Sequence, residues 1–438
     1  MVSGKKIGVI SLGCDKNRVD TEKMLFRLKQ KHTLVSDPEQ AQIVIINTCA
    51  FLQSSRSEAI EEILAVSSLK DVGVLEKVIV TGCLPQKFID GVFSELTEAD
   101  AFLGVSDYDK ILEVIDRLYE GEDRINAVGE ISNDTFTDRV TTTSSYAYLK
   151  IADGCSNHCT YCLIPKIRGK FRSTPSELLI EEAKKLGETN ELILVAQDTA
   201  KYGSDLKDES LVKLLRKLTE LDNIHSVRLL YCYPESITEE LINEIKTNDK
   251  IIKYVDVPLQ HASDRILKLM NRKGSFNEYL SLIERLKKEV SGIAIRSTFI
   301  TGFPTETEED FAVLVDFLKR AKLFNAGFFA YSREEDTPAY KLDGQVLESV
   351  KKKRLKKLYS EQKKIVKENL KKFIGQTLSV TACGFDQNEL CYYGRAYFNA
   401  PDIDGKIYFF STEEINAGDR VSVSILNATD YDLYGEQV

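Results

Sequence analysis

Three short runs of apolar, β-branched-rich residues stand in the first hundred positions of the chain. The runs cover 6–13, 43–48 and 77–82, and stretches with helical spacing lie between and after them, for example at 20–30 and 54–68. Strands that alternate with helices are typical of parallel βαβ units. The pattern therefore predicts an α/β domain with a parallel sheet over residues 1–118.

The same alternation continues through the middle of the chain. Six further strands are expected at 146–152, 191–196, 226–231, 253–258, 293–300 and 326–331. A closed TIM barrel has eight βα units, so six units predict a partial, (β/α)6 TIM-like barrel. A Lys-rich stretch at 349–372 carries leucine and isoleucine at helical spacing, which indicates a helix packing one stripe on the barrel. This second domain is expected over 146–372.

The end of the chain has a different pattern. Residues 373–438 alternate aromatic and polar positions between glycine turn points, which predicts a small all-β barrel. Residues 119–145 carry Gly, Asn, Asp and a TTTSS run, and are expected to link the first two domains. The expected fold class is thus α/β, with a small β-barrel as the last domain.

Composition narrows the class of protein. The chain has 438 residues with 43% hydrophobic content, as in globular proteins, and no apolar run of membrane-spanning length. Its first residues read as a strand and not as a signal peptide, so a cytoplasmic location is expected. The net charge of -9 weakens any function based on broad contact with nucleic-acid phosphates.

Cysteine is the residue type that points to chemistry. Nine cysteines in a chain without a signal peptide do not suggest a disulfide scaffold. Cys14, Cys49 and Cys83 each end one of the first three apolar runs. Because parallel strands end at one edge of a sheet, these thiols are expected to converge on one site of unspecified metal. The alternative is that they are ordinary buried cysteines.

A second group of cysteines directly follows the first strand of the expected barrel. The string GCSNHCTYC places Cys155, Cys159 and Cys162 in CxxxCxxC spacing. Three thiolates can bind three corners of a cubane iron–sulfur cluster and leave one iron without a protein ligand. Zinc is the alternative because His158 lies inside the motif, although structural zinc motifs usually come as two pairs.

This motif, with an aromatic residue before its last cysteine, resembles the radical S-adenosylmethionine superfamily. The resemblance implies a 4Fe-4S cluster whose open iron binds S-adenosylmethionine, and a 5′-deoxyadenosyl radical that breaks an unactivated C–H bond. It implies that the cofactor is contacted by Tyr161, Gln197, Asp198 and Gly302. Abstraction by a radical needs no general base, and beyond the cluster ligands the sequence identifies no catalytic residue.

The upstream cysteines resemble the N-terminal domain of methylthiotransferases, in which three cysteines hold a second 4Fe-4S cluster that handles sulfur. Strings such as SLGCDKNRVDTE at 11–22 and VDVPLQHAS at 255–263 resemble the branch that modifies a protein. That branch methylthiolates the β-carbon of an aspartate in small-subunit ribosomal protein twelve. The other main branch, which modifies a tRNA adenosine, usually reads GCQMN at the first cysteine. Asp15 and Thr174 depart from the usual protein-modifying pattern, at flanking positions only.

The last domain bears on the choice of substrate. In this family its place is held by a TRAM domain, and here it contains ten acidic and three basic residues. Such a surface repels phosphate and attracts a basic protein.

The charge thus favours a basic ribosomal protein as a partner, free or in the small subunit. The resemblance further implies an electron donor such as flavodoxin or ferredoxin. We expect no membrane partner, and tRNA is the less favoured substrate. A non-catalytic carrier of electrons or sulfur is a third alternative, but the open coordination site argues against it.

Overall fold

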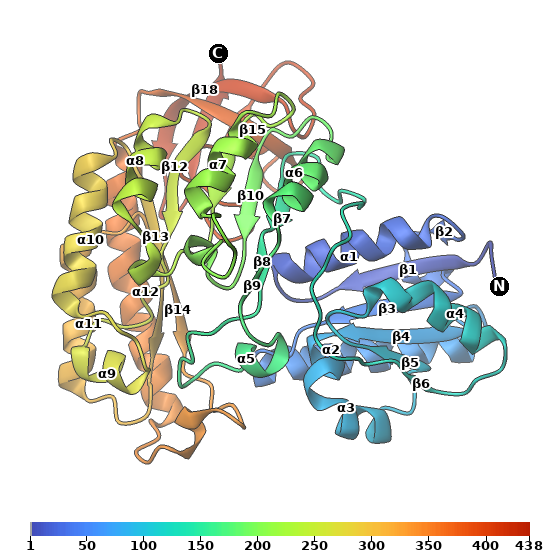
Figure 1. The fold of residues 1–438 in the computed structure, drawn as a ribbon. Helices are drawn as coiled ribbons and strands as arrows, with labels where there is room; N and C mark the ends of the chain where they lie inside the picture. Colours follow the sequence, from blue (N-terminus) through green and yellow to red (C-terminus); the bar gives the residue numbers. More distant parts are fainter. Residues whose placement is uncertain (1) are drawn as a thin grey trace.

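The structure is a computed structural model that describes residues 2–438. An N-terminal sheet domain lies beside the central barrel, and the C-terminal strands form a small barrel at one end of the central one (Figure 1). Within the described residues, no helix is both long enough and apolar enough to cross a membrane.

The N-terminal domain is built on a parallel six-stranded sheet in the order β2-β1-β3-β4-β5-β6. Its strands are β1 (Lys6–Ser11), β2 (Thr33–Leu34), β3 (Ile43–Thr48), β4 (Lys77–Gly82), β5 (Ala101–Leu103) and β6 (Ile125–Asn126). Its helices are α1 (Asp15–Leu28), α2 (Gln53–Ser67), α3 (Cys83–Glu95) and α4 (Ile111–Tyr119), with 3-10 turns η1 (Pro38–Gln40), η2 (Ser68–Val72) and η3 (Tyr108–Lys110). All six residues of β3 are buried, as expected for a parallel sheet covered by helices on both faces. Strand β6 comes from the segment expected as a linker.

The central domain is a parallel sheet in the order β7-β10-β11-β12-β13-β14, in which β7 and β14 are the two edges. The strands are β7 (Ala147–Lys150), β10 (Leu192–Val195), β11 (Val227–Leu229), β12 (Ile251–Asp256), β13 (Ala294–Thr301) and β14 (Asn325–Ala330). A separate antiparallel pair is formed by β8 (Ala152–Asp153) and β9 (Arg172–Ser173). Because its edge strands do not pair, the barrel is partial, which confirms the predicted fold class.

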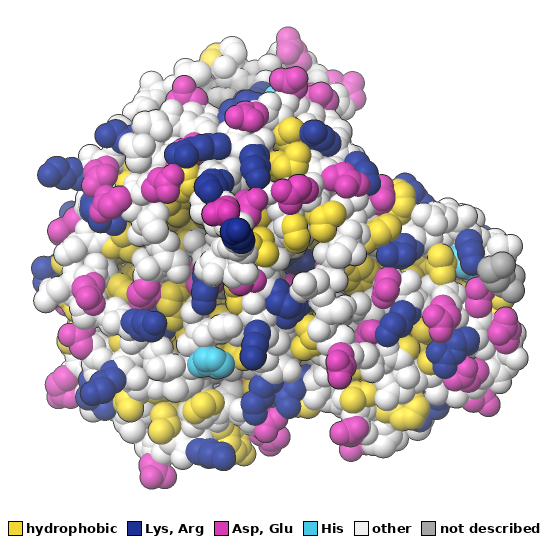
Figure 2. All heavy atoms as spheres, viewed as in Figure 1, with side chains coloured by type: hydrophobic (Ala, Val, Ile, Leu, Met, Phe, Trp, Pro, Cys, Tyr) yellow, Lys and Arg dark blue, Asp and Glu magenta, His cyan; other side chains and the backbone are white. Residues whose placement is uncertain are grey.

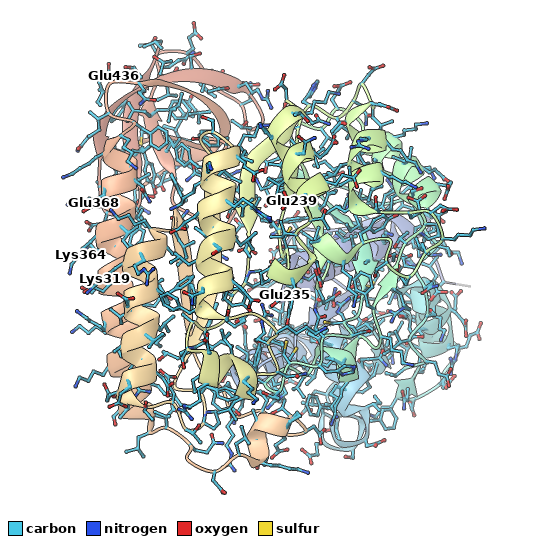
Figure 3. All side chains as sticks on the ribbon, turned by 60° about the vertical axis from the view of Figure 1, so that its left-hand side comes forward. Glu235, Glu239, Lys319, Lys364, Glu368 and Glu436 are labelled. Carbon is cyan, nitrogen blue, oxygen red and sulfur yellow. The ribbon has the colours of Figure 1, made fainter. Side chains whose placement is uncertain are left out.

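Helices cover the outer face of this sheet, and α10, α11 and α12 run side by side (Figure 3). The helices of the domain are α5 (Ile164–Ile167), α6 (Ser176–Lys185), α7 (Leu211–Thr219), α8 (Glu239–Thr247), α9 (Asp264–Leu269), α10 (Phe276–Glu289), α11 (Glu308–Ala321) and α12 (Glu348–Lys371). The 3-10 turns are η4 (Thr199–Lys201), η5 (Pro234–Ser236) and η6 (Pro338–Lys341). In α12, Leu358, Val366 and Leu370 are buried, whereas Lys364 and Glu368 are exposed, so the Lys-rich helix packs by one stripe as predicted.

The C-terminal domain is a closed barrel in the order β15-β16-β17-β19-β18. Its strands are β15 (Thr377–Asp386), β16 (Cys391–Arg395), β17 (Ile407–Phe410), β18 (Arg420–Ala428) and β19 (Leu433–Gln437). Phe398 and Phe409 are fully buried, whereas Phe385, Phe410 and Tyr431 are exposed. The aromatic residues are therefore divided between the core and the surface.

The N-terminal domain contacts the barrel at both edges of its open sheet. On the β7 side, Lys150 forms an ion pair with Asp20 of α1. On the β14 side, Arg56 of α2 lies 2.7 Å from the carboxylate of Glu334, which is 1% exposed. The N-terminal domain thus spans the opening that a closed barrel would fill with two more βα units.

The two barrels meet around a buried carboxylate at the start of β10. Arg228 donates to Glu191 at 2.5 Å, and Arg395 of the C-terminal barrel donates to its other oxygen at 3.0 Å. Burial disfavours the charged form of Glu191, but the two guanidiniums outweigh it and hold the pKa of Glu191 below its ordinary value. This ion triad joins strands that are far apart in the sequence.

We predict that Glu191→Gln lowers the free energy of unfolding by about 3–5 kcal/mol, because two buried guanidiniums lose their counter-charge. The native pKa of Glu191 is depressed, so its contribution is present above the unfolded pKa of about 4.3 and is lost as the pH falls further. Urea denaturation at pH 7 and pH 3.5 measures both effects, and the difference between variant and wild type should shrink in acid.

The matched control is Glu188→Gln, since Glu188 is exposed and its ion pair with His225 lies at the surface. Its effect should stay below about 1 kcal/mol. Equal effects of the two substitutions would contradict a structural role for the triad.

Candidate active site

Cys14, Cys49 and Cys83 follow three adjacent strands of the N-terminal sheet, β1, β3 and β4. The chain turns there into helices, with α1 beginning directly after Cys14 and α3 beginning at Cys83. Backbone N–H groups at a helix N-terminus favour a nearby negative charge, and thiolate is the form of cysteine that binds metal. The placement at one sheet edge is the one that the spacing predicted.

The three cysteine-bearing loops pack closely against one another through two glycines with positive φ. A side chain at Gly13 would meet Cβ of Cys49 at 2.8 Å, and one at Gly82 would meet the carbonyl oxygen of Thr48 at 2.6 Å. Glycine is therefore required directly before Cys14 and Cys83. The close packing holds the three thiols at one edge of the sheet.

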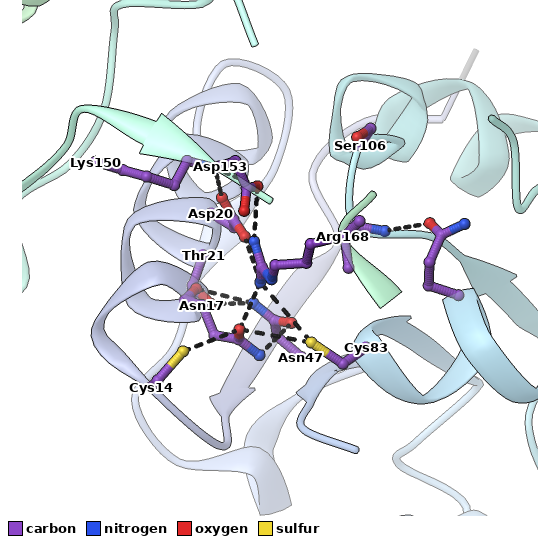
Figure 4. Close-up of polar contacts among 12 residues, drawn as sticks. Cys14, Asn17, Asp20, Thr21, Asn47, Cys83, Ser106, Lys150, Asp153 and Arg168 are labelled. Atoms are coloured by element: carbon purple, nitrogen blue, oxygen red, sulfur yellow. Dashed lines mark hydrogen bonds and ion pairs between the residues drawn. The ribbon is translucent and has the colours of Figure 1, made fainter. Parts of the chain in front are cut away.

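The side-chain amide of Asn17 lies between two of these thiols and contacts both (Figure 4). The Sγ atoms of Cys14 and Cys83 lie 3.6 and 3.9 Å from its Oδ1, and Arg168 of the barrel domain donates to the same oxygen at 2.7 Å. Burial raises the pKa of Cys83 to about 12, against the opposing charge of Arg168. The N-terminal thiols therefore face a cation supplied by the other domain.

The second group of cysteines lies in the loop between β8 and α5, at the end of the first barrel strand. Each sulfur has a hydrogen-bond partner on a nearby N–H or O–H group. The pairs are Cys155 with the N–H of Asn157 at 3.5 Å, Cys162 with the N–H of Ile164 at 3.4 Å, and Cys159 with the hydroxyl of Tyr233 at 3.5 Å. Such contacts stabilise thiolate ligands, which are negatively charged.

The donor chemistry of the two thiol groups fits an iron–sulfur cluster. Among residues 2–438, no three His, Cys, Asp or Glu side chains are arranged to hold a single metal ion. A cubane cluster has a wider core than one ion and binds through cysteine thiolates, so it accepts ligands that stand farther apart. Both groups of three cysteines supply the donor type that such a cluster needs.

The four residues expected to contact the cofactor surround this loop. Gln197 donates to Asp153 at 3.0 Å, and its buried Oε1 has no partner among the described atoms. Asp198 accepts from Asn157 at 3.2 Å and is fully buried, which ties it to the cysteine loop. Tyr161 packs in the same apolar cluster as Phe303, the residue that follows Gly302. The structure thus places Tyr161, Gln197 and Asp198 at the cysteine motif, and Gly302 next to a residue of the Tyr161 cluster.

Two buried arginines near the cysteines are not evident from the sequence. Arg272 is 5% exposed, lies 3.6 Å from the ring centre of Tyr233 and donates to the carbonyl of Pro258. Arg168 is 1% exposed and pairs with two aspartates of this chain. Neither arginine belongs to a recognisable motif, so only the fold reveals their positions.

Family models match all three domains. The descriptions are the Radical SAM superfamily for residues 149–318, Uncharacterized protein family UPF0004 for 6–104 and the TRAM domain for 374–438. The ribosomal protein uS12 methylthiotransferase RimO of Clostridium botulinum is 44% identical over 436 residues, which is 98% of this chain and 97% of the relative. The protein of the same name from Lachnoclostridium phytofermentans is 44% identical over 98% of this chain and 99% of its own.

The chain belongs to the RimO family. RimO proteins are methylthiotransferases by name, so the chain is an enzyme of this class. Membership of the radical SAM superfamily implies 4Fe-4S clusters and S-adenosylmethionine as cofactors, which agrees with the thiol groups described above.

Solved structures support the fold of this RimO-family chain. The radical S-adenosylmethionine methyltransferase TsrM from Kitasatospora setae has a TM-score of 0.57 and 14% identity, covering 77% of each chain. The cobalamin-dependent radical enzyme OxsB has a TM-score of 0.53 and 12% identity, covering 89% of this chain and 64% of its own. At these identities the similarity concerns the fold alone.

The exposure of the N-terminal thiols predicts a strong order of reactivity in the metal-free protein. Cys14 is exposed, whereas Cys83 is 5% exposed and has its pKa raised to about 12. At pH 8, iodoacetamide should label Cys14 at least about a hundredfold faster than Cys83, because the thiolate is the reactive form. Peptide mass spectrometry after timed quenching measures both rates, and the urea-unfolded protein, with similar rates at both cysteines, is the control. Similar rates in the folded protein would contradict the buried position of Cys83.

Proposed function

We propose that this chain replaces a C–H bond at the β-carbon of an aspartate in ribosomal protein uS12 with a methylthio group. The observation that carries the proposal is that one buried arginine joins the site of the N-terminal cysteines to Asp153, two residues before the first cysteine of the other group. The RimO proteins that match nearly the whole chain support uS12 as the substrate. A tRNA adenosine remains the second candidate.

In this proposal, Cys155, Cys159 and Cys162 hold the 4Fe-4S cluster that binds S-adenosylmethionine, and Cys14, Cys49 and Cys83 hold a second one. When bound, these groups supply the 5′-deoxyadenosyl radical and the site of sulfur transfer. The residues of the chain bind and orient them.

Several residues prepare the cofactor pocket. Asp198 fixes the cysteine loop through Asn157, and the unpartnered oxygen of Gln197 is free to accept a hydrogen bond from S-adenosylmethionine. Tyr161 and the backbone at Gly302 line the same region, next to the apolar cluster around Phe303. Burial of these groups excludes water from the surroundings of the radical. We propose these four residues as cofactor contacts.

The charge of the C-terminal barrel favours a basic protein as the substrate. One of its three basic residues, Arg395, is buried against Glu191 and so does not offset the acidic surface. The face of the molecule in Figure 2 carries interspersed basic and acidic side chains, not the continuous basic stripe that phosphate backbones require. Acidic residues attract a basic partner at longer range.

The proposal includes three further elements. The domain limits are 1–118, 146–372 and 373–438, and the segment 119–145 between the first two contributes β6 to the N-terminal sheet. The electron donor is a flavodoxin or ferredoxin. The enzyme works in the cytoplasm, because that is where ribosomal subunits are assembled.

The first test counts iron and sulfide after anaerobic reconstitution. The wild-type chain should bind about eight irons, and the triple variant Cys155→Ala/Cys159→Ala/Cys162→Ala about four. The matched variant Cys14→Ala/Cys49→Ala/Cys83→Ala should also keep about four and should still release 5′-deoxyadenosine from S-adenosylmethionine on reduction. Zinc in place of iron, or loss of all iron in either triple variant, would contradict the two-cluster arrangement.

The second test supplies uS12 or unmodified tRNA with S-adenosylmethionine, sulfide and dithionite. Mass spectrometry should find that one aspartate of uS12 has gained SCH3 in place of hydrogen, while tRNA is unchanged. Modification of tRNA instead would overturn the proposed substrate, and release of no 5′-deoxyadenosine would favour a non-catalytic carrier.

A further inference from the structure

Arg168 follows the second group of cysteines in the chain and reaches the site of the first group, where Cys14 and Cys83 lie near it (Figure 4). It follows Cys162 by six positions, and its side chain leaves the barrel domain to enter the N-terminal one. Its Nη2 atom donates to Asn17 at 2.7 Å and lies 3.8 Å from the Sγ of Cys83. Its Nη1 atom donates to Asp153 at 2.9 Å, two residues before Cys155. One guanidinium thus binds Asn17 beside the N-terminal cysteines and Asp153 beside the second group of cysteines.

The charge of Arg168 acts on all three N-terminal thiols. Cys14, Cys49 and Cys83 all interact electrostatically with it, and the side chain is 2% exposed, so little solvent screens the effect. Asp20 and Asp153 balance the cation, at 3.2 and 2.9 Å. Asp153 binds the Nη1 atom, whereas Asp20 binds the same Nη2 atom that lies near Cys83.

We propose that Arg168 is a positioning residue that raises the reduction potential of the cluster held by Cys14, Cys49 and Cys83. The inference rests on the proposed function, because it requires that these thiols hold a cluster. A reduced cluster carries one more negative charge than an oxidised one, so a buried cation and an N–H donor to a ligand sulfur favour reduction. Since Arg168 belongs to the loop after Cys162, docking of the two domains and tuning of this cluster depend on the same side chain.

A comparison with Lys150 distinguishes an effect on the cluster from simple stabilisation of the domain junction. It is also buried, and it forms ion pairs with the same two aspartates, Asp20 and Asp153. Within residues 2–438, Lys150 makes no hydrogen bond to a cysteine sulfur. Loss of either cation weakens the domain junction, but only loss of Arg168 removes a donor from Cys83.

The experiment measures the potential of the N-terminal cluster alone. In the full-length Cys155→Ala/Cys159→Ala/Cys162→Ala background, Arg168→Gln is compared with Lys150→Gln and with the conservative Arg168→Lys. After reconstitution and iron counting, the one-electron reduction by dithionite is followed by electron paramagnetic resonance at controlled potentials. Arg168→Gln should lower the midpoint so that the ratio of reduced to oxidised cluster falls about tenfold, which equals 59 mV for one electron.

The controls fix what each result means. Lys150→Gln should shift the midpoint by much less, and Arg168→Lys should recover part of the shift because it restores the charge without the planar fork. With about four irons bound, an unchanged midpoint in Arg168→Gln, or an equal shift in Lys150→Gln, overturns the inference and leaves the proposed function standing. Failure of the parent to bind iron overturns the proposed function itself.

If the Arg168→Gln variant does not retain iron, a substitution of its counter-charge tests the inference instead. Asp20→Asn removes a carboxylate beside Arg168 and leaves the cation in place. A midpoint higher than that of the parent supports the inference, and an unchanged or lower one overturns it.

Discussion

A charge buried away from water is stable only when opposite charges and hydrogen-bond partners lie within reach, and the junction of the first two domains is built on this requirement. Arg168 and Lys150 come from the barrel, whereas Asp20 comes from α1. None of the three has its full set of partners within its own domain. The two domains therefore have one arrangement in which these charges are satisfied, and that arrangement places the two cysteine-bearing edges together.

The same device recurs where the two barrels meet, with the signs reversed. There a single carboxylate, Glu191, lies between guanidiniums from the central and the C-terminal barrel. Buried ion pairs contribute little net stability compared with apolar packing, but they make mispaired arrangements costly. Both junctions thus favour a defined orientation of three folded units over simple adhesion between apolar surfaces.

Most of the architecture could be predicted because it depends on local pattern. Strands β3 and β4 are apolar runs buried along nearly their whole length, and they begin and end where the pattern put them. The edge strand β6 was not predicted because two residues carry no pattern. The role of Arg168 could not be predicted either, since its partner Asp20 is 148 positions away and only the tertiary fold brings the two together.

The candidate site likewise has residues that the sequence predicts and residues that only the fold reveals. The six cysteines follow from spacing within a motif or from a repeated strand-end position. Arg272 and Tyr233 come from different loops, and their stacking beside Cys159 depends on how β11 and the segment after α9 are oriented. Sequence thus indicates which atoms can bind a cluster, whereas the charges and donors around those atoms come from the packing of distant segments.

The order of synthesis gives the domain junction a further meaning. Asp20 and the first three strand-end cysteines leave the ribosome long before Lys150 and Arg168, which are their partners in the finished protein. Domains generally fold as units from the N-terminus during translation. Until the barrel segment emerges and docks, the first domain therefore lacks the cations that pair with Asp20 and the arginine that contacts Cys83. Maturation of the nascent chain is thereby coupled to completion of its second domain.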